Sequence, residues 1–379
     1  MSDTPPIAGE GAERFPKTIE VIERGRRQEL HQGVQFCVRL EAEVVADLAV
    51  GESPDGRPFT PDTLMPWLSA GKPLTAVAIL RRVERGQLSL DEPVARTIPE
   101  FAANDKEAIT LRHVLMHTAG IAAVPTGWPQ TSWDEIVARI CQAPVMERFR
   151  IGEDAAYDPN RSWFILGEIL RRSTGLPVDQ LLRTGLCEAL GMENSWPAMT
   201  AGRHGSYGER IGVMSARDAS GQLKMTHGHT LEMCTAPSPG SSWRGPMHDL
   251  AKFYEALRLG GEGNGQRILN PQTVVDMTSR HRVGLFDMTF QHRIDFGLGV
   301  VIDSNCYGKE SVPYGFGRHC SERAFGHGGA QSSIGFADPD RGLVVAAVAN
   351  GMPGEPQHNR RFRELNSAIY EDLGLAANG

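Results

Sequence analysis

The stretch SAGKPLTAVAILRRVERG (69–86) decides the fold assignment, because it sets a serine and a lysine three positions apart at the start of an apolar helix. Residues three apart lie on one helix face, so the Ser69 hydroxyl and the Lys72 amine can touch. The apolar positions after Lys72 predict a buried side, and Gly86 predicts the helix end. A different explanation of the same letters is a helix-capping serine beside an exposed lysine.

This pair suits nucleophilic catalysis. A serine hydroxyl is a weak nucleophile, and a lysine takes its proton only if the lysine pKa falls below its usual value of ~10.4. Burial and the positive end of the helix dipole both lower that pKa. Lys72 is the only lysine between residues 18 and 105, in a chain that otherwise uses arginine, which cannot serve as a base. The free N–H of Ser69 at the helix start is expected to help bind an oxyanion.

A second candidate is Tyr157, in AAYDPNRSWFILGEILRRSTG (155–175). The dipeptide Asp158-Pro159 interrupts regular structure, and a helix is predicted to begin just after it, near Ser162. A tyrosine in such a turn can project its hydroxyl into a cleft. The alternative is a tyrosine that packs at a domain edge with its hydroxyl in water.

A third candidate is FGHGGAQSS (325–333). The small residues after His327 allow a strand edge to approach a ligand closely. The alternative is a glycine-rich hairpin with a surface histidine.

Apolar patterns along the chain predict an α/β (α+β) fold. Strand-like segments lie at both ends of the chain, and helical patterns fill the middle, so the sequence predicts one antiparallel sheet built from both termini and flanked by helices. The expected strands are 34–40 and 42–50, then segments around 293–303, 322–326, 331–338 and 342–350. The predicted division is a flexible tail (1–16), a sheet domain (17–90 with 286–379) and an inserted, mostly helical domain (91–285).

Taken together, these segments resemble the serine β-lactamase-like superfamily, which includes class C β-lactamases, penicillin-binding-protein-like D-aminopeptidases, carboxylesterases and a statin-forming acyltransferase. The resemblance runs from about residue 34 to 350 in the expected order and implies a β-lactamase/transpeptidase-like fold. It is carried by SAGKPLTAVAILRRVERGQLSLDEPVARTIPEF, ITLRHVLMHTAGI, Tyr157 before WFILGEI, and HGG before a DPxxGL strand; SSWRGPMHDLAKFYEAL and FGLGV also agree.

The resemblance implies roles for particular residues. Ser69 would be the acylated nucleophile, Lys72 its proton partner, and Tyr157 the tyrosine that shares the acid–base work. The expected oxyanion and substrate-binding residues are Ala330, which would supply the second oxyanion N–H, with His327, Gly328, Gly329 and Asn160.

Two departures from the pattern matter. Asn160 stands one position late for the Tyr-x-Asn of class C β-lactamases, and His327 replaces the lysine of a Lys-Thr-Gly triplet. Loss of that permanent cation removes a partner for a substrate carboxylate. Both departures fit the esterase and acyltransferase branches better than antibiotic hydrolysis.

Composition excludes several classes of protein. The chain has 379 residues, a net charge of −7 and no basic block, which argues against nucleic acid or an anionic membrane as a partner. No window is apolar enough to span a bilayer, and the N-terminus lacks a signal-peptide pattern, so a cytoplasmic protein is expected. Six scattered cysteines and the His113/His117 pair, which lacks the glutamate of HExxH, indicate neither a metal nor a cofactor.

The predicted function is serine-dependent acyl transfer through an acyl-enzyme on Ser69, with hydrolysis of a small-molecule ester or amide. One alternative is an acyltransferase that passes the acyl group to an amine or alcohol in secondary-metabolite biosynthesis. Another is a non-catalytic binding module of the same fold. Four tryptophans in segments expected near the cleft suggest an apolar or aromatic acyl group: Trp128, Trp133, Trp163 and Trp243.

Overall fold

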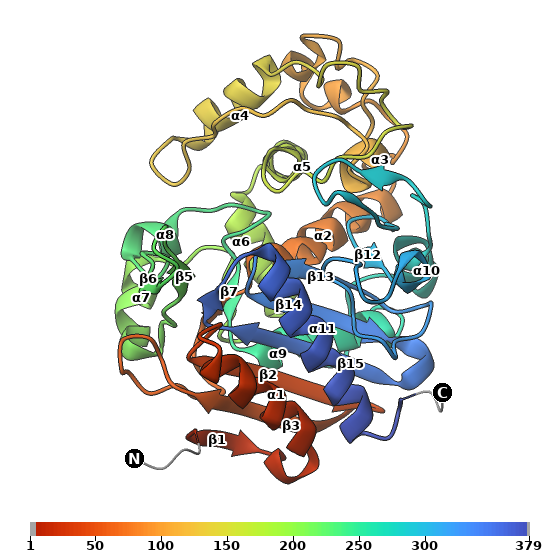
Figure 1. Cartoon of the computed structure of the whole chain (residues 1–379). Coiled ribbons are helices and arrows are strands. Elements are labelled where there is room, and N and C mark those ends of the chain that lie inside the picture. The colour runs from red at the N-terminus through yellow and green to blue at the C-terminus, as the bar shows by residue number, and fades with distance from the viewer. Residues whose placement is uncertain (1–4, 377–379) are drawn as a thin grey trace.

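The computed structural model describes residues 5–376. Its centre is an antiparallel sheet with the order β1-β3-β2-β15-β14-β13-β12 (Figure 1). The strands are β1 (Ile7–Glu10), β2 (Gly33–Leu40), β3 (Glu43–Gly51), β12 (Val301–Ile302), β13 (Phe325–Gly329), β14 (Ser333–Asp338) and β15 (Leu343–Ala349). Strands from the two ends of the chain meet where β2 pairs with β15, with Cys37 opposite Ala346. The predicted sheet built from both termini is therefore confirmed.

Helices surround this sheet and fill the middle of the chain. They are α1 (Pro16–Arg27), α2 (Lys72–Glu84), α3 (Leu111–Leu115), α4 (Trp133–Gln142), α5 (Arg161–Thr174), α6 (Val178–Leu182), α7 (Ala201–Tyr207), α8 (Leu231–Thr235), α9 (Met247–Arg258), α10 (Pro271–Thr278) and α11 (Glu355–Asp372). Small two- and three-stranded sheets join the loops: β4 (Met65–Pro66) with β7 (Arg244–Gly245), β5 (Ser215–Arg217) with β6 (Leu223–Met225) and β16 (Gly351–Met352), β8 (Glu262–Gly263) with β9 (Gln266–Arg267), and β10 (Phe286–Asp287) with β11 (His292–Arg293).

Side chains of β15 alternate between two hydrophobic cores because successive residues of a strand point to opposite faces. Val344, Ala346 and Val348 belong to the core that includes α9, and the intervening residues belong to the core that includes α1 and α11. Both faces of the sheet are thus covered, which is why β15 is apolar throughout.

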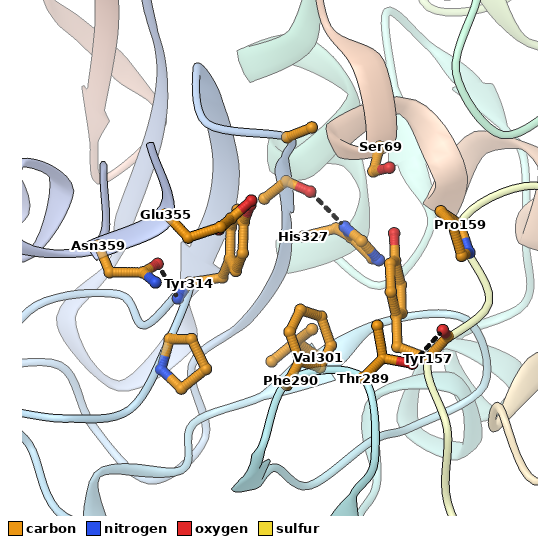
Figure 2. Close-up of a pocket in the computed structure, with 13 residues that line it drawn as sticks. Ser69, Tyr157, Pro159, Thr289, Phe290, Val301, Tyr314, His327, Glu355 and Asn359 are labelled. Carbon is orange, nitrogen blue, oxygen red and sulfur yellow. Dashed lines mark hydrogen bonds between the residues drawn. The ribbon is translucent and has the colours of Figure 1, made fainter. Parts of the chain in front are cut away.

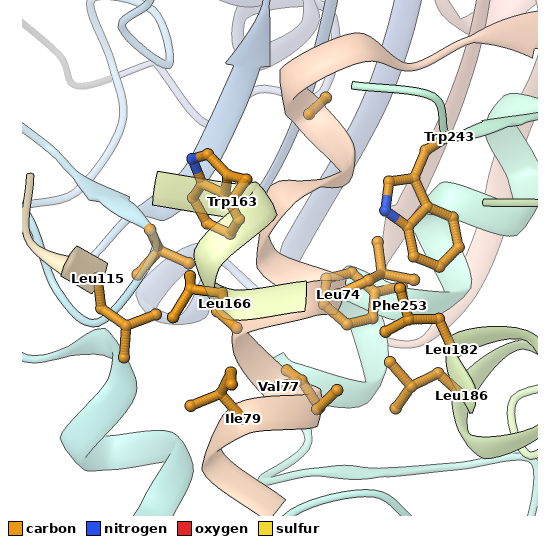
Figure 3. Packing of buried hydrophobic residues seen from close by; sticks show 14 of the residues in the cluster. Leu74, Val77, Ile79, Leu115, Trp163, Leu166, Leu182, Leu186, Trp243 and Phe253 are labelled. Carbon is orange, nitrogen blue, oxygen red and sulfur yellow. The ribbon is translucent and has the colours of Figure 1, made fainter. Parts of the chain in front are cut away.

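The first core continues from the sheet into the helical region through α2 (Figure 3). Leu74, Val77 and Ile79 of α2 are fully buried in it together with Trp163 of α5 and Trp243. Since α2 is buried along most of its length, the Ser69–Lys72 end of this helix has a rigid support.

Two expectations about chain organisation need correction. The prediction of a flexible tail over 1–16 is wrong for residues 5–16, because β1 pairs with β3 and Phe15 is fully buried against Phe36. Residues 1–4 lie outside the described part. Helix α9 falls within the range 91–285 predicted as a separate helical domain, yet it packs on β2, β14 and β15. Within residues 5–376, no helix has the length and apolar character needed to cross a membrane.

Candidate active site

Ser69 lies in a tight turn that leads into α2. The turn is the short 3-10 helix η2 (Leu68–Gly71), and Leu68 before the serine has a φ of 50°, in the left-handed region that is costly for a side chain of this kind. Trp67 holds this backbone in place, because its ring stacks on Trp243 at 6.0 Å and its indole N–H donates to the Gly245 carbonyl at 2.9 Å. Ser69 is thereby fixed at the start of a buried helix with its side chain slightly exposed.

Lys72 is fully buried and touches Ser69. Its Nζ lies 3.0 Å from Ser69 Oγ and 2.7 Å from the carbonyl oxygens of both Pro159 and Gly240. Burial lowers the pKa of Lys72 to about 7, against a smaller opposite effect of Asp158. A neutral amine has two N–H groups and one lone pair. Because the two carbonyls can accept both N–H groups, the lone pair is left for the Ser69 proton.

The surroundings of Lys72 require a small residue at 240. A Cβ atom on Gly240 would lie 3.0 Å from Lys72 Nζ and 2.8 Å from the Trp163 side chain. The centre of the Trp163 ring lies 5.1 Å from Lys72 Nζ. This close packing explains both the approach of the Gly240 carbonyl and the exclusion of water that lowers the lysine pKa.

Tyr157 reaches the same pocket from the other side. Its hydroxyl points toward Ser69 (Figure 2), and its ring centre lies 5.7 Å from Lys72 Nζ. Burial raises the pKa of Tyr157, although the Ser69 hydroxyl acts in the opposite direction. The phenol is therefore protonated near neutral pH, where it can donate a hydrogen bond or a proton but cannot serve as the base.

Two buried carboxylates hold the Tyr157 turn. Asp287 Oδ1 accepts the backbone N–H of Tyr157 at 3.0 Å, and its other oxygen pairs with Arg282 at 3.0 Å, with both side chains fully buried. Asp158 accepts the N–H groups at the start of α5, Asn160, Arg161 and Ser162. These bonds begin α5 at Arg161, one residue before the predicted position, and turn the Pro159 carbonyl toward Lys72.

We expect Asp287→Ala to lower the free energy of unfolding by about 3–5 kcal/mol, because it leaves the fully buried Arg282 without its counter-charge. Urea denaturation followed by tryptophan fluorescence measures this. The matched control is Asp340→Ala, which breaks an exposed ion pair with Arg323 and should cost less than about 1 kcal/mol. Equal stability of the two variants would contradict the structural role given to Asp287.

Strand β13 brings the predicted second oxyanion donor beside the nucleophile. The Ser333 hydroxyl donates to the Trp67 carbonyl at 2.6 Å, and a Cβ atom on Gly329 would lie 2.4 Å from that same oxygen. The end of β13 is thus pressed against η2, and Ala330 lines the pocket together with Ser69. The N–H of Ser69 lies in the first turn of η2, where it has no partner within the helix. Their joint role as an oxyanion hole stays a prediction.

His327 is buried in the wall of this pocket and uncharged. Burial, aided by the charge of Lys72, lowers the pKa of His327 to about 3. Its Nδ1 donates to the Gly328 carbonyl at 2.7 Å, whereas Nε2 has no hydrogen-bond partner among residues 5–376. His327 therefore supplies no positive charge to a ligand.

The pocket has a volume of about 380 Å³ (Figure 2). Five of the predicted site residues line it, and Lys72 lies just beneath Ser69. The lining residues are Ser69, Tyr157, Pro159, Thr289, Phe290, Val301, Pro313, Tyr314, His327, Gly328, Ala330, Glu355 and Asn359.

Other predicted residues lie elsewhere. Asn160 is exposed and outside the pocket: it stands at the N-cap of α5, and from this turn Tyr157 and Pro159 line the cavity. Gly329 lies against Trp67 and not in the lining. None of the four tryptophans lines this pocket, so their positions do not support the prediction of an apolar or aromatic acyl group; Trp163 and Trp243 are buried in the first core. His117, one of the two histidines considered as metal ligands, accepts the Asp158 N–H through Nδ1 at 3.0 Å.

Sequence reasoning missed several lining residues, notably Phe290, Tyr314 and Glu355. Tyr314 packs over Gly328, where a Cβ atom would lie 2.3 Å from the ring. Glu355 is the first residue of α11. No local motif marks these positions. A glutamate in the first turn of a helix is common, so Glu355 does not stand out in the sequence. Among residues 5–376, no group of three or more His, Cys, Asp or Glu side chains could hold a metal ion.

The fold and the serine–lysine pair define a serine hydrolase or acyltransferase. The Beta-lactamase family model matches residues 19–369. The chain belongs to the beta-lactamase family, as the resemblance in the sequence implied. Among its relatives, the Esterase/beta-lactamase LipL of Mycobacterium tuberculosis is 26% identical in an alignment 346 positions long that covers 84% of this chain and 77% of that protein. Esterase EstB of Burkholderia gladioli is 25% identical in an alignment 386 positions long that covers 88% of this chain and 91% of that protein.

Solved structures agree with this assignment. A penicillin-binding protein homologue from Caulobacter crescentus superposes with a TM-score of 0.78 at 27% identity and covers 97% of this chain and 100% of its own. Further relatives carry the names of acyltransferases. The predicted β-lactamase/transpeptidase-like fold is confirmed, and the relatives divide between esterases, penicillin-binding-protein-like proteins and acyltransferases.

Proposed function

We propose that this enzyme hydrolyses a small-molecule ester or amide through an acyl-enzyme on Ser69. The observation that carries the proposal is the contact between Ser69 Oγ and Lys72 Nζ at 3.0 Å, where two carbonyls occupy the other bonding positions of the amine. A buried lysine with a pKa of about 7 is neutral often enough at neutral pH to act as a general base.

In the acylation step, Ser69 Oγ attacks the substrate carbonyl carbon while its proton passes to Lys72 Nζ. The N–H groups of Ser69 and Ala330 stabilise the oxyanion of the tetrahedral intermediate. Tyr157, whose phenol is protonated, donates its proton to the leaving oxygen or nitrogen and recovers one from Lys72. The C–O or C–N bond breaks, an alcohol or amine departs, and the acyl group remains on Ser69.

In the second step, water attacks the acyl carbon and gives up a proton to Lys72. The ester bond to Ser69 breaks, Ser69 regains its proton, and the acid is released. The apolar side chains of the pocket, such as Val301 and Phe290, limit the number of water molecules near the ester.

Transfer of the acyl group to an amine or alcohol is the second candidate. It is supported by the relatives named as acyltransferases and by the volume of about 380 Å³, which leaves space for an acceptor beside the acyl group. Both candidates share the acyl-enzyme and differ only in the molecule that resolves it.

The test is covalent labelling followed by product analysis. We expect a fluorophosphonate to add to one site, and peptide mass mapping to place the adduct on Ser69. In a separate assay, the unlabelled enzyme should cleave short-chain para-nitrophenyl esters. If amines are added and an amide forms at the expense of the acid, the result favours the transferase. A protein that is neither labelled nor active would contradict both candidates and favour a binding module.

A further inference from the structure

Three aromatic rings form a continuous wall from the catalytic tyrosine toward the start of α11. Phe290 lies between the other two (Figure 2), with its ring centre 4.6 Å from that of Tyr157 and 5.7 Å from that of Tyr314. All three rings line the pocket that contains Ser69. An aromatic face carries negative electrostatic potential and attracts cations within about 6 Å of its centre.

The exposed carboxylate of Glu355 stands at the far end of this wall and is hydrogen-bonded to it. The Tyr314 hydroxyl donates to Glu355 at 2.8 and 3.0 Å and accepts the Gln331 N–H at 3.3 Å. The Gln331 side chain in turn accepts the N–H of Gly354 at 2.7 Å. Through Tyr314, Glu355 is thus connected by hydrogen bonds to Gln331, the residue that follows the predicted oxyanion donor Ala330. Tyr314 donates only one proton to this carboxylate, so the carboxylate can accept further hydrogen bonds from a ligand.

The lining of the pocket holds one acidic side chain. Among the residues that the structure describes there, Glu355 has the one carboxylate and no lysine or arginine is present, while His327 is neutral and both tyrosines are protonated. Lys72 lies beneath Ser69, with its amine enclosed by Ser69 Oγ and two carbonyls. A ligand carboxylate would find no lysine or arginine among the described lining residues, whereas a ligand ammonium would find one carboxylate and two aromatic faces.

We propose that this pocket selects substrates that carry an organic ammonium group, held between Glu355 and the rings of Phe290 and Tyr314 while the acyl carbonyl reaches Ser69. This inference rests on the proposed acyl transfer for its substrate and adds the chemical class. The competing explanation is that Glu355 only complements the N-terminal dipole of α11. The two explanations differ in selectivity, since a glutamate that serves the helix alone gives no preference among substrates.

The first experiment compares three para-nitrophenyl esters of similar shape: a trimethylammoniobutanoyl ester, its neutral dimethylhexanoyl isostere, and an anionic glutaryl ester. We expect kcat/KM to be highest for the cationic ester and lowest for the anionic one. Glu355→Gln should lower the cationic-to-neutral ratio of kcat/KM by about five- to tenfold, as expected for one partly exposed charge pair with aromatic support.

Glu371→Gln is the matched control. It makes the same chemical change at the other end of α11, where Glu371 pairs with Lys17, and should keep the wild-type ratio. A wild-type enzyme that shows no preference for the cationic ester, or a Glu355→Gln ratio equal to that of the control, would overturn the cation site.

The second experiment measures binding without chemistry. Butyltrimethylammonium should bind the wild-type protein in isothermal titration calorimetry and bind Glu355→Gln several-fold more weakly. If the ion binds in this way but no ester is cleaved, the cation site stands and the proposed hydrolysis fails. If esters are cleaved and the ion does not bind, the hydrolysis stands and the cation site is overturned.

Discussion

Ser69→Ala is expected to lower kcat/KM for ester hydrolysis by at least about a thousandfold, because no other hydroxyl occupies the position from which the acyl-enzyme forms. The remaining rate would come from substrate binding and the oxyanion donors. The fold should survive the change. In the wild-type structure, Lys72 Nζ also bonds the carbonyls of Pro159 and Gly240, and these two bonds satisfy a neutral amine without Ser69.

The measurement is steady-state hydrolysis of a para-nitrophenyl ester, combined with intact mass after fluorophosphonate treatment. Ser69→Ala should show neither turnover above this level nor an adduct. Ser206→Ala, an exposed serine in α7 that bonds only the Arg203 carbonyl, is the control and should behave as wild type. Full activity or an intact adduct in Ser69→Ala would refute the nucleophile assignment.

Local signals carried most of what the sequence predicted. The three-residue spacing of Ser69 and Lys72 is a property of one helical turn, so it needs no knowledge of the rest of the chain. The short apolar runs between turn residues at both ends of the chain likewise predicted the strands of the sheet. The small residues after His327 predicted a close approach of a strand edge to a ligand; the structure shows the end of β13 close to the Trp67 backbone, and the approach to a ligand stays a prediction.

Features set by contacts between distant segments were not predictable in this way. Ile7–Glu10 contains a glycine and a charged residue in four positions, yet it forms β1 because it pairs with the edge of β3. Asn160 lies outside the pocket because its backbone N–H and that of Arg161 donate to Asp158 at the start of α5. Tyr314 and Glu355 meet through a hydrogen bond between residues 41 positions apart, and no periodic pattern encodes such a pair.

The second large effect is expected from the role proposed for Lys72 as the base. Lys72→Met removes the amine at nearly constant length and should lower kcat/KM by about a thousandfold. Lys72→Arg is the informative comparison, because a guanidinium keeps the positive charge but does not give up its proton near neutral pH. If proton transfer is the essential function, both variants are inactive; an arginine variant with substantial activity would show that the charge alone suffices.

The pH dependence of the wild-type enzyme tests the same assignment without a substitution. Only the neutral amine accepts the Ser69 proton, so kcat/KM should rise as the pH passes through about 7, the pKa of Lys72, and level off above it. Below that pH, each unit should cost about tenfold. No other group in the pocket accounts for such a rise, since the pKa of His327 is about 3 and that of Tyr157 is raised above its ordinary value. Initial rates measured between about pH 5 and 9, corrected for spontaneous ester hydrolysis, give the profile. A rate that stays constant or falls over this interval would show that no base with a pKa near 7 controls the reaction, and would contradict the pKa and role proposed for Lys72.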